Sequence, residues 1–239
     1  MLQNLDLTKI LVLDIETVPQ YSTYNEAPEK WQHLWDKKSA FIKRDEQQTS
    51  AEIYPRAGIY AEFGKIICIS VGYFNRSGNF WQFRTKSFYG DDEELLLTEF
   101  ATMLNRHFDD PSNLLCAHNG KEFDFPYLCR RMLINGVEIP DLLNIAGKKP
   151  WEVNHLDTME LWKFGDFKNF TSLELLAATF NIPTPKDDID GSQVWTVYWN
   201  DHDVERIKTY CQKDVVTVAQ LLLRFRGEEL LDEGDVIYT

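Results

Sequence analysis

An apolar, β-branched run at residues 9–15, KILVLDI, constrains the fold more than any other feature of the sequence. Runs of this kind are typical of strands that are buried on both faces at the centre of a sheet. The run carries Asp14 near its end, and Glu16 follows it. Because side chains alternate along a strand, we expect both carboxylates to lie on one face. An isolated pair of acids at this spacing more often marks solvated charges at a strand end.

The rest of the chain alternates strand and helix patterns. Two β-rich runs flank a short turn with Gly78, which predicts a hairpin. The expected strands cover residues 64–74, 79–88, 113–119 and 152–161, and the expected helices cover 91–108, 123–135, 171–180 and 203–226. This order predicts an α/β protein with a central mixed β-sheet flanked by α-helices.

Residues 20–62 interrupt this pattern. They contain a predicted helix near 28–43 and a charged, polar tail, and we interpret them as an inserted subdomain or flap. The length of 239 residues and the hydrophobic content of 44% suit one domain that carries such an insertion. We therefore expect residues 1–239 to form a single domain with an insertion at about 20–62.

The acidic balance limits the classes of partner. The chain has 25 Lys and Arg against 38 Asp and Glu, which gives a formal net charge of −13. Tight, sequence-independent binding of long duplexes usually requires a basic face. A site built from carboxylates contributes negative charge itself, and bound divalent cations would reverse the local sign that a phosphate meets. The charge therefore argues against a duplex-binding protein and not against metal-assisted phosphate chemistry.

Targeting signals and cysteine pairs are not found in the sequence. The N-terminal apolar run is short and lacks a small-residue cleavage site, and no stretch reaches the roughly 18 apolar residues of a membrane span. The cysteines are scattered singly in apolar segments, at Cys68, Cys116, Cys129 and Cys211. This spacing predicts buried, reduced thiols and no zinc site, so we expect a cytoplasmic protein without a membrane partner.

Two further segments carry acids at meaningful positions. Tyr210 and Asp214 are four residues apart in a strongly periodic helix, which places them one turn apart on the same face. Asp124 lies in HNGKEFDFPYL, where a strand is followed by a helix. Each feature alone is compatible with a structural role: a half-buried Tyr beside a surface Asp, or an Asp that caps its helix.

The order of these segments is more specific than any one of them. DIET at a strand tip, HNGKEFDFPYL at a strand-to-helix junction and YCQKD in a late helix resemble the three exonuclease motifs of the DEDD superfamily. The resemblance spans residues 9–226 and is weakest across the insertion. The branch with Tyr four residues before the final Asp is the one that the chain resembles, since Thr209 stands where the other branch has His. Exonuclease domains of family B DNA polymerases belong to this branch, so the resemblance implies a ribonuclease H-like fold.

The resemblance also implies a set of site residues. Asp14 would bridge two cations, Glu16 and Asp214 would complete one site, and Asp124 would hold the second largely through water. Two Mg²⁺ or Mn²⁺ ions suit such carboxylate ligands and can stabilise both oxygens of a phosphodiester displacement. Tyr210 would orient the attacking water, because a phenol with a pKa near 10 is a poor base at neutral pH. Further members implied near the terminal nucleotide of the substrate are the Thr17 backbone and the Asn119 side chain.

The expected activity is that of a metal-dependent 3′-to-5′ exonuclease that releases nucleoside 5′-monophosphates. Single-stranded DNA is favoured over RNA because of the branch that the chain resembles. The chain ends about thirteen residues after the last helix, so we expect a stand-alone nuclease, with any DNA polymerase or repair protein acting in trans. Two alternatives stay open: an inactive ribonuclease H-like binding or scaffold module, and a haloacid dehalogenase-like phosphatase. The second does not account for the Tyr210 and Asp214 pair.

Several other residues have a structural interpretation that we prefer. Asp157 follows the last short strand, where turn capping explains it as well as catalysis does, and we leave it outside the catalytic set. His118 and His155 lie beside apolar strands, where single histidines are more often packed than metal-bound. Base stacking is an alternative role for three tryptophan rings, but core packing is the interpretation that we prefer for Trp31, Trp35 and Trp81.

Overall fold

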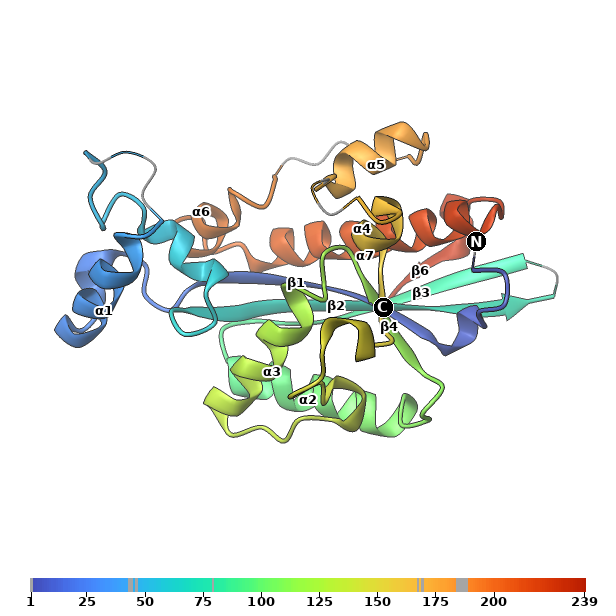
Figure 1. Cartoon of the computed structure of the whole chain (residues 1–239), viewed down its shortest axis with the longest axis horizontal. Helices are drawn as coiled ribbons and strands as arrows, with labels where there is room; N and C mark the ends of the chain where they lie inside the picture. The colour runs from blue at the N-terminus through green and yellow to red at the C-terminus, as the bar shows by residue number, and fades with distance from the viewer. Residues whose placement is uncertain are drawn as a thin grey trace.

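The central sheet of the computed structural model has six strands in the order β5-β4-β1-β2-β3-β6 (Figure 1). The structure describes residues 2–42, 45, 47–78, 80–166, 168, 170–183 and 189–239. The strands are β1 (Ile10–Pro19), β2 (Gly64–Ser77), β3 (Phe80–Tyr89), β4 (Leu114–Ala117), β5 (Leu156–Asp157) and β6 (Val236–Tyr238). β1, β2 and β3 form an antiparallel meander, whereas β4 and β5 continue the sheet in parallel beside β1. The predicted α/β class and mixed sheet are confirmed.

Helices other than α1 cover both faces of this sheet. The helices are α1 (Glu29–Ser39), which belongs to the inserted segment, α2 (Glu93–His107), α3 (Asp124–Asn135), α4 (Thr158–Lys163), α5 (Leu173–Thr179), α6 (Val194–Trp199) and α7 (Val204–Arg226). Figure 1 shows α2 and α3 on one face and α7, with α4, α5 and α6, on the other. The longest helix, α7, begins at the N-cap Asp203 and ends at Gly227 in the left-handed conformation, which a glycine adopts without a Cβ penalty.

Side-chain alternation along β1 divides the core into two layers. Leu11 and Leu13 belong to the cluster that packs against α2 and α3. Ile10 and Val12 belong to a second cluster with α7 residues such as Val218. Each strand residue therefore faces the opposite layer from its neighbour, as the period of two requires. Even-numbered positions of β1 face α7, and this sets the direction of the functional side chains.

One predicted element is wrong in type. A strand was expected over residues 152–161, but β5 contains only Leu156–Asp157, and α4 begins at Thr158. The Asp157 carboxylate accepts hydrogen bonds from the backbone N–H groups of Met159 and Glu160, so it starts a helix where the apolar pattern alone suggested an extended chain.

Other boundaries differ less from the prediction. Helix α1 is shorter than the predicted 28–43, and α6 and β6 were not predicted. The predicted helix end at residue 43 and the strand start at residue 79 lie outside the described residues. Within the part of the chain that the structure describes, no helix has the length and apolar character needed to cross a membrane.

The inserted segment has a small aromatic core of its own. Trp35 is fully buried there, in edge-to-face contact with Tyr54 and Phe63. Its core-packing interpretation is confirmed, and base stacking by this ring is excluded because the ring is enclosed. The half-buried Trp31 also packs edge-on against Phe63, and the indole N–H of Trp81 donates to Glu228 at the other end of the molecule.

Candidate active site

Asp14 and Glu16 lie on the α7 side of β1. They continue the series of Ile10 and Val12, which pack against α7. Glu16 is only 9% exposed. The pairing of β1 with β2 shifts register between Glu16 and Thr17. A bulge of this kind bends the strand and redirects the side chains beside it, and such bulges are frequent next to active sites.

Helix α7 presents a second set of polar groups to these carboxylates. Tyr210 and Asp214 lie one turn apart, and the charge of Asp214 raises the pKa of the Tyr210 phenol more than any other charge does. Between them in sequence, the Cys211 thiol donates to Asp14 Oδ2 at 3.3 Å and to the Asp14 carbonyl oxygen at 3.5 Å. The last motif of the sequence therefore contacts the first directly.

Asp124 reaches the same place from α3. It is the first residue of that helix, and its side chain is almost fully buried. Its Oδ1 accepts a hydrogen bond from the backbone N–H of Ile15 at 3.2 Å. Ile15 separates Asp14 from Glu16, so this bond places the Asp124 carboxylate beside the other two.

Burial and mutual repulsion dominate the electrostatics of this cluster. Burial raises the pKa of Asp14 well above its usual range, and the charges of Glu16, Asp124 and Asp214 raise it further. Burial is also the main reason that the pKa of Glu16 is raised, with Asp214 the largest contribution from another charge. Burial raises the pKa of Asp124 to about 7, although backbone N–H donors oppose the shift. The structure thus brings all four predicted acids within electrostatic reach of one another.

Such a cluster fits divalent cations. Within the described residues, one ligand atom each from Asp14, Glu16 and Cys211 lies within 4.8 Å of the others. Asp124 and Asp214 are not part of that close group, but both are near enough to raise the pKa of Asp14. A divalent cation would offset the repulsion that the carboxylates exert on one another. Because hard cations prefer oxygen ligands, we assign the ligand role to the carboxylates and treat the Cys211 thiol as a hydrogen-bond donor.

Tyr210 is held as a neutral phenol. Burial, followed by the charges of Asp214 and Glu16, raises its pKa above the ordinary value near 10. Ile189 is buried in the same cluster as the ring, and a Cβ added to Gly191 would lie 3.9 Å from the phenol oxygen. The segment before α6 therefore covers the ring and restricts its movement.

Asp157 organises the loop beside Asp124. Its carboxylate accepts hydrogen bonds from the backbone N–H groups of Asn119 and Lys121 at 3.0 and 3.1 Å, in addition to capping α4. The capping interpretation from the sequence is confirmed. Asn119 adopts a left-handed conformation with φ of 65°, which Asn tolerates better than most residues. Asp157 thus fixes the backbone from which the Asn119 side chain extends.

Thr17 is half-buried directly after Glu16. The Tyr127 hydroxyl of α3 donates to the Gly58 carbonyl oxygen at 2.6 Å, and a Cβ added to Gly58 would lie 3.0 Å from the backbone of Val18, the residue after Thr17. The returning end of the inserted segment is therefore attached next to the first motif. The substrate-binding roles of Thr17 and Asn119 stay predictions.

Both histidines singled out in the sequence are packed and hydrogen bonded. His118 lies between the Thr158 hydroxyl at 2.8 Å and the Thr171 carbonyl oxygen at 3.0 Å, and burial lowers its pKa. His155 accepts from the Leu115 N–H, and burial lowers its pKa to about 4. The structural interpretation of both residues is confirmed.

Sequence reasoning missed the contact of Cys211 with Asp14. The sequence suggested only a buried, reduced thiol. A helical signal was present nevertheless, because Cys211 precedes Asp214 by three residues and so shares a side of α7 with it.

Comparisons with known proteins agree with the fold and identify a family. A solved structure of the family B DNA polymerase from the hyperthermophilic archaeon Pyrobaculum calidifontis matches with a TM-score of 0.54 at 18% identity. The match covers 90% of this chain and 24% of the polymerase, so the chain spans about a quarter of that protein's length. At this identity the likeness shows the fold, which is ribonuclease H-like. No curated protein sequence matches the chain.

A family model matches over residues 59–233, which include Asp124, Tyr210 and Asp214. Asp14 and Glu16 lie before the matched segment, so their place in the site comes from the three-dimensional structure. The match covers well over half of the chain and gives no support to the phosphatase alternative. The chain therefore belongs to the family of predicted 3′-5′ exonucleases related to the exonuclease domain of PolB.

Proposed function

We propose that this protein is a metal-dependent exonuclease of the Tyr-containing DEDDy branch that hydrolyses phosphodiester bonds at nucleic-acid 3′ ends and releases nucleoside 5′-monophosphates. The observation that carries the proposal is the convergence of acids from β1, α3 and α7 in one buried cluster, in a family of predicted exonucleases. In this proposal residues 1–239 act as one exonuclease domain, with 20–62 as its insertion.

The four carboxylates would hold two divalent cations. Asp14, Glu16 and Asp214 would bind the first, and Asp14 and Asp124 the second. Bound Mg²⁺ or Mn²⁺ would lower the pKa of the attacking water and stabilise charge on the leaving oxygen. The donation from Cys211 and the bond from the Ile15 N–H fix the orientations of Asp14 and Asp124, so these ligands need little rearrangement.

Tyr210 would position the attacking water. Because its phenol stays protonated, it does not act as the general base. Its hydroxyl lies close enough to Asp214 and Glu16 for their charges to raise its pKa, and a protonated phenol can both donate a hydrogen bond and accept one from water. The ring packs against a buried cluster that includes Ile189 and Ile207, and this packing restricts the position of the oxygen.

The substrate would be a single strand, with DNA favoured and RNA possible. The backbone of Thr17 and the side chain of Asn119 flank the acid cluster and would contact the terminal nucleotide. A net charge of −13 favours a small footprint at the strand end over extended contact with a duplex. A DNA polymerase or a repair protein would act with this enzyme in trans.

The test is degradation of single-stranded DNA and RNA labelled at either end, with Mg²⁺, Mn²⁺ or EDTA. We expect progressive shortening from the 3′ end that requires metal. Asp14→Ala should lower the rate more than about 10³-fold, because it removes a ligand shared by both cations. Asp109→Ala, which removes an exposed acid outside the cluster, should retain full activity.

Two outcomes would overturn the proposal. If no metal supports degradation of any substrate, the chain is an inactive ribonuclease H-like binding module. If degradation survives in the Asp14→Ala variant, the activity does not come from this site.

A further inference from the structure

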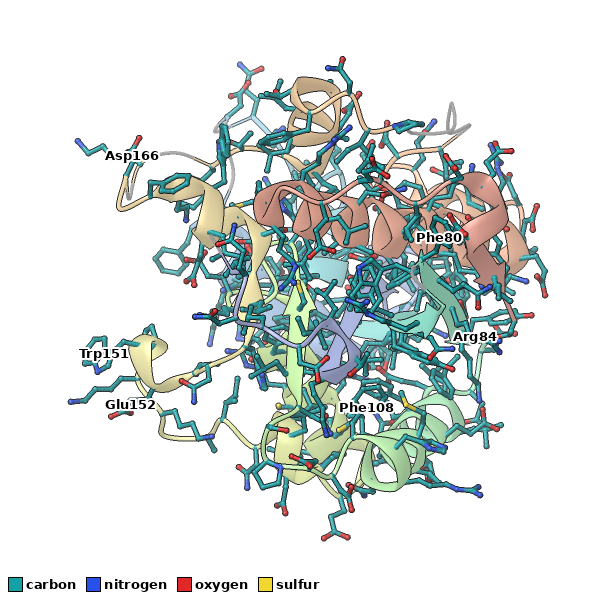
Figure 2. The ribbon with its side chains drawn as sticks, turned by 90° about the vertical axis from the view of Figure 1, so that its right-hand side faces the viewer. Phe80, Arg84, Phe108, Trp151, Glu152 and Asp166 are labelled. Carbon is teal, nitrogen blue, oxygen red and sulfur yellow. The ribbon has the colours of Figure 1, made fainter. Side chains whose placement is uncertain are left out.

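Among the described residues of the two loops that flank β5, at the edge of the sheet, three aromatic side chains are strongly exposed. Trp151 is 76% exposed before β5, and Phe164 and Phe170 are 77% and 65% exposed after it. Figure 2 shows Trp151 and Asp166, which lies in the second loop, projecting from the same side of the molecule, and Phe80 on the opposite side. An acidic protein thus displays apolar rings at one edge, where they add nothing to the core.

The backbone at Phe164 is strained. Phe164 caps the C-terminus of α4 in the left-handed conformation, with φ of 45°, and Gly165 follows with φ of 89°. A bulky residue at positive φ is uncommon, because its Cβ is crowded there. Burial of the Phe164 ring does not offset this backbone strain, because the ring is exposed to solvent. We therefore infer that the ring has a binding role.

Phe170 is paired with a cation. Lys163 Nζ lies 4.3 Å from the centroid of its ring, and the remaining ring surface is open to solvent. Lys168 is exposed in the same loop. Residues 144–171 carry four lysines and four acids, one of which is the buried Asp157, so this edge is close to neutral in a chain with a net charge of −13. The edge is therefore less repulsive to phosphate than the average surface.

The segments that carry both rings are anchored to the loop that precedes Asp124. Phe170 directly precedes Thr171, whose carbonyl oxygen lies 3.0 Å from His118 Nε2. His118 is followed by Asn119, which the Asp157 carboxylate holds. The same carboxylate caps the short helix that ends at Phe164. The loop that carries Phe164 and Phe170 and the loop before Asp124 are therefore held by the same contacts, which His118 and Asp157 make.

We propose that Phe164 and Phe170 stack on unpaired bases of the substrate strand, on the 5′ side of the scissile phosphate, while Lys163 and Lys168 contact its phosphates. The proposal rests on the proposed function and adds a requirement for unpaired nucleotides. Single-stranded nucleic acid fits this surface because exposed rings bind any base face and lysines attract the backbone. Bases in a duplex are already stacked, so a paired end gains little from these rings.

The test compares Phe164→Ala/Phe170→Ala with Phe80→Ala, which removes an equally exposed ring at the far hairpin. Binding of 5′-fluorescein oligothymidylate is measured by anisotropy in EDTA. We expect the double variant to bind about 10- to 100-fold more weakly, since each stacked base contributes roughly a factor of 5 or more, and Phe80→Ala to bind as the parent does. Phe164→Trp/Phe170→Trp should restore binding, which separates stacking from a folding defect.

A second substrate separates this proposal from the exonuclease proposal. The 4-nitrophenyl ester of thymidine 5′-monophosphate has no upstream bases, so the double variant should hydrolyse it at the parent rate while its kcat/KM for the oligonucleotide falls. Equal binding of the oligonucleotide by the double variant and the parent overturns the stacking role, whether or not the protein is active. If the parent hydrolyses neither the ester nor the oligonucleotide, the exonuclease proposal is overturned, and the binding measurement still tests the stacking role.

Discussion

Two groups of buried carboxylates lie on opposite faces of the same sheet, and their surroundings differ. On the α2 and α3 face, Glu93 forms a bidentate ion pair with Arg131 and also accepts from the Ile66 N–H at 2.7 Å and from the Asn135 amide at 3.0 Å. On the α7 face, the charges that shift the pKa of Asp14 are all carboxylates.

The difference distinguishes a buried carboxylate that stabilises the fold from buried carboxylates that are suited to a functional site. Glu93 has a cation and hydrogen-bond donors built into the fold, so its charge is balanced when the chain folds. Among the described residues, the charges that act on Asp14 come from other acids, and they raise its pKa instead of lowering it. A bound cation can offset repulsion of this kind.

Replacing one acid in each group should change stability in opposite directions. Glu93→Gln leaves the Arg131 guanidinium buried without an anion and should lower the free energy of unfolding by about 3–5 kcal/mol. Asp14→Asn keeps an acceptor for Cys211 but removes one repelling charge, so the metal-free protein should gain about 1 kcal/mol at pH 8. Urea denaturation in EDTA measures both. The comparison fails if Asp14→Asn destabilises the protein as much as Glu93→Gln does.

Tyr210→Phe should show whether the Tyr210 hydroxyl positions the attacking water. The ring and its packing stay, but the hydroxyl is lost, so we expect kcat to fall about 10- to 100-fold while the affinity for Mn²⁺ is unchanged. Steady-state kinetics and calorimetric titration with Mn²⁺ make the two measurements. Tyr198→Phe, which removes a hydroxyl that binds Asp91, is the matched control. Equal losses in the two variants would assign Tyr210 a structural role only.

Metal should stabilise the protein more at pH 8 than at pH 6. Asp124 has a folded pKa of about 7 against an ordinary value of 3.8, so its burial costs stability increasingly as pH rises from about 4 to 7 and fully above that range. When the folded and unfolded states differ by one bound proton, the free energy of unfolding changes by about 1.4 kcal/mol per pH unit. In a protein of this size that change shifts the midpoint of thermal unfolding by about 3–5 °C. Thermal unfolding with Mg²⁺ and with EDTA at both pH values checks this. Equal stabilisation at both would show that the acids are already balanced within the chain.

Much of this arrangement was predictable from local sequence signals. The apolar run before Asp14, the turn at Gly78 and the sustained helical periodicity of α7 are all local signals, and the elements that they predict are confirmed. The prediction of a strand over 152–161 was wrong because the Asp157 cap depends on two side-chain hydrogen bonds, which an apolar pattern does not reveal. Convergence of the acids was inferred only from a resemblance to known motifs. The sequence places Cys211 on the same side of α7 as Asp214, but it does not predict the contact with Asp14, because that contact depends on how α7 lies across β1.

Cys211 gives the smallest expected effect and the sharpest test of ligand assignment. Cys211→Ala removes one hydrogen bond to Asp14, worth about 1 kcal/mol, so the affinity for Mg²⁺ should fall less than tenfold and kcat at saturating Mg²⁺ should stay constant. Cys129→Ala, which removes a thiol that donates to the Leu143 carbonyl oxygen, should change neither value. If the thiol were a ligand, its loss would weaken metal binding as strongly as Asp14→Asn does. In that case the close group of Asp14, Glu16 and Cys211 would itself be the metal site.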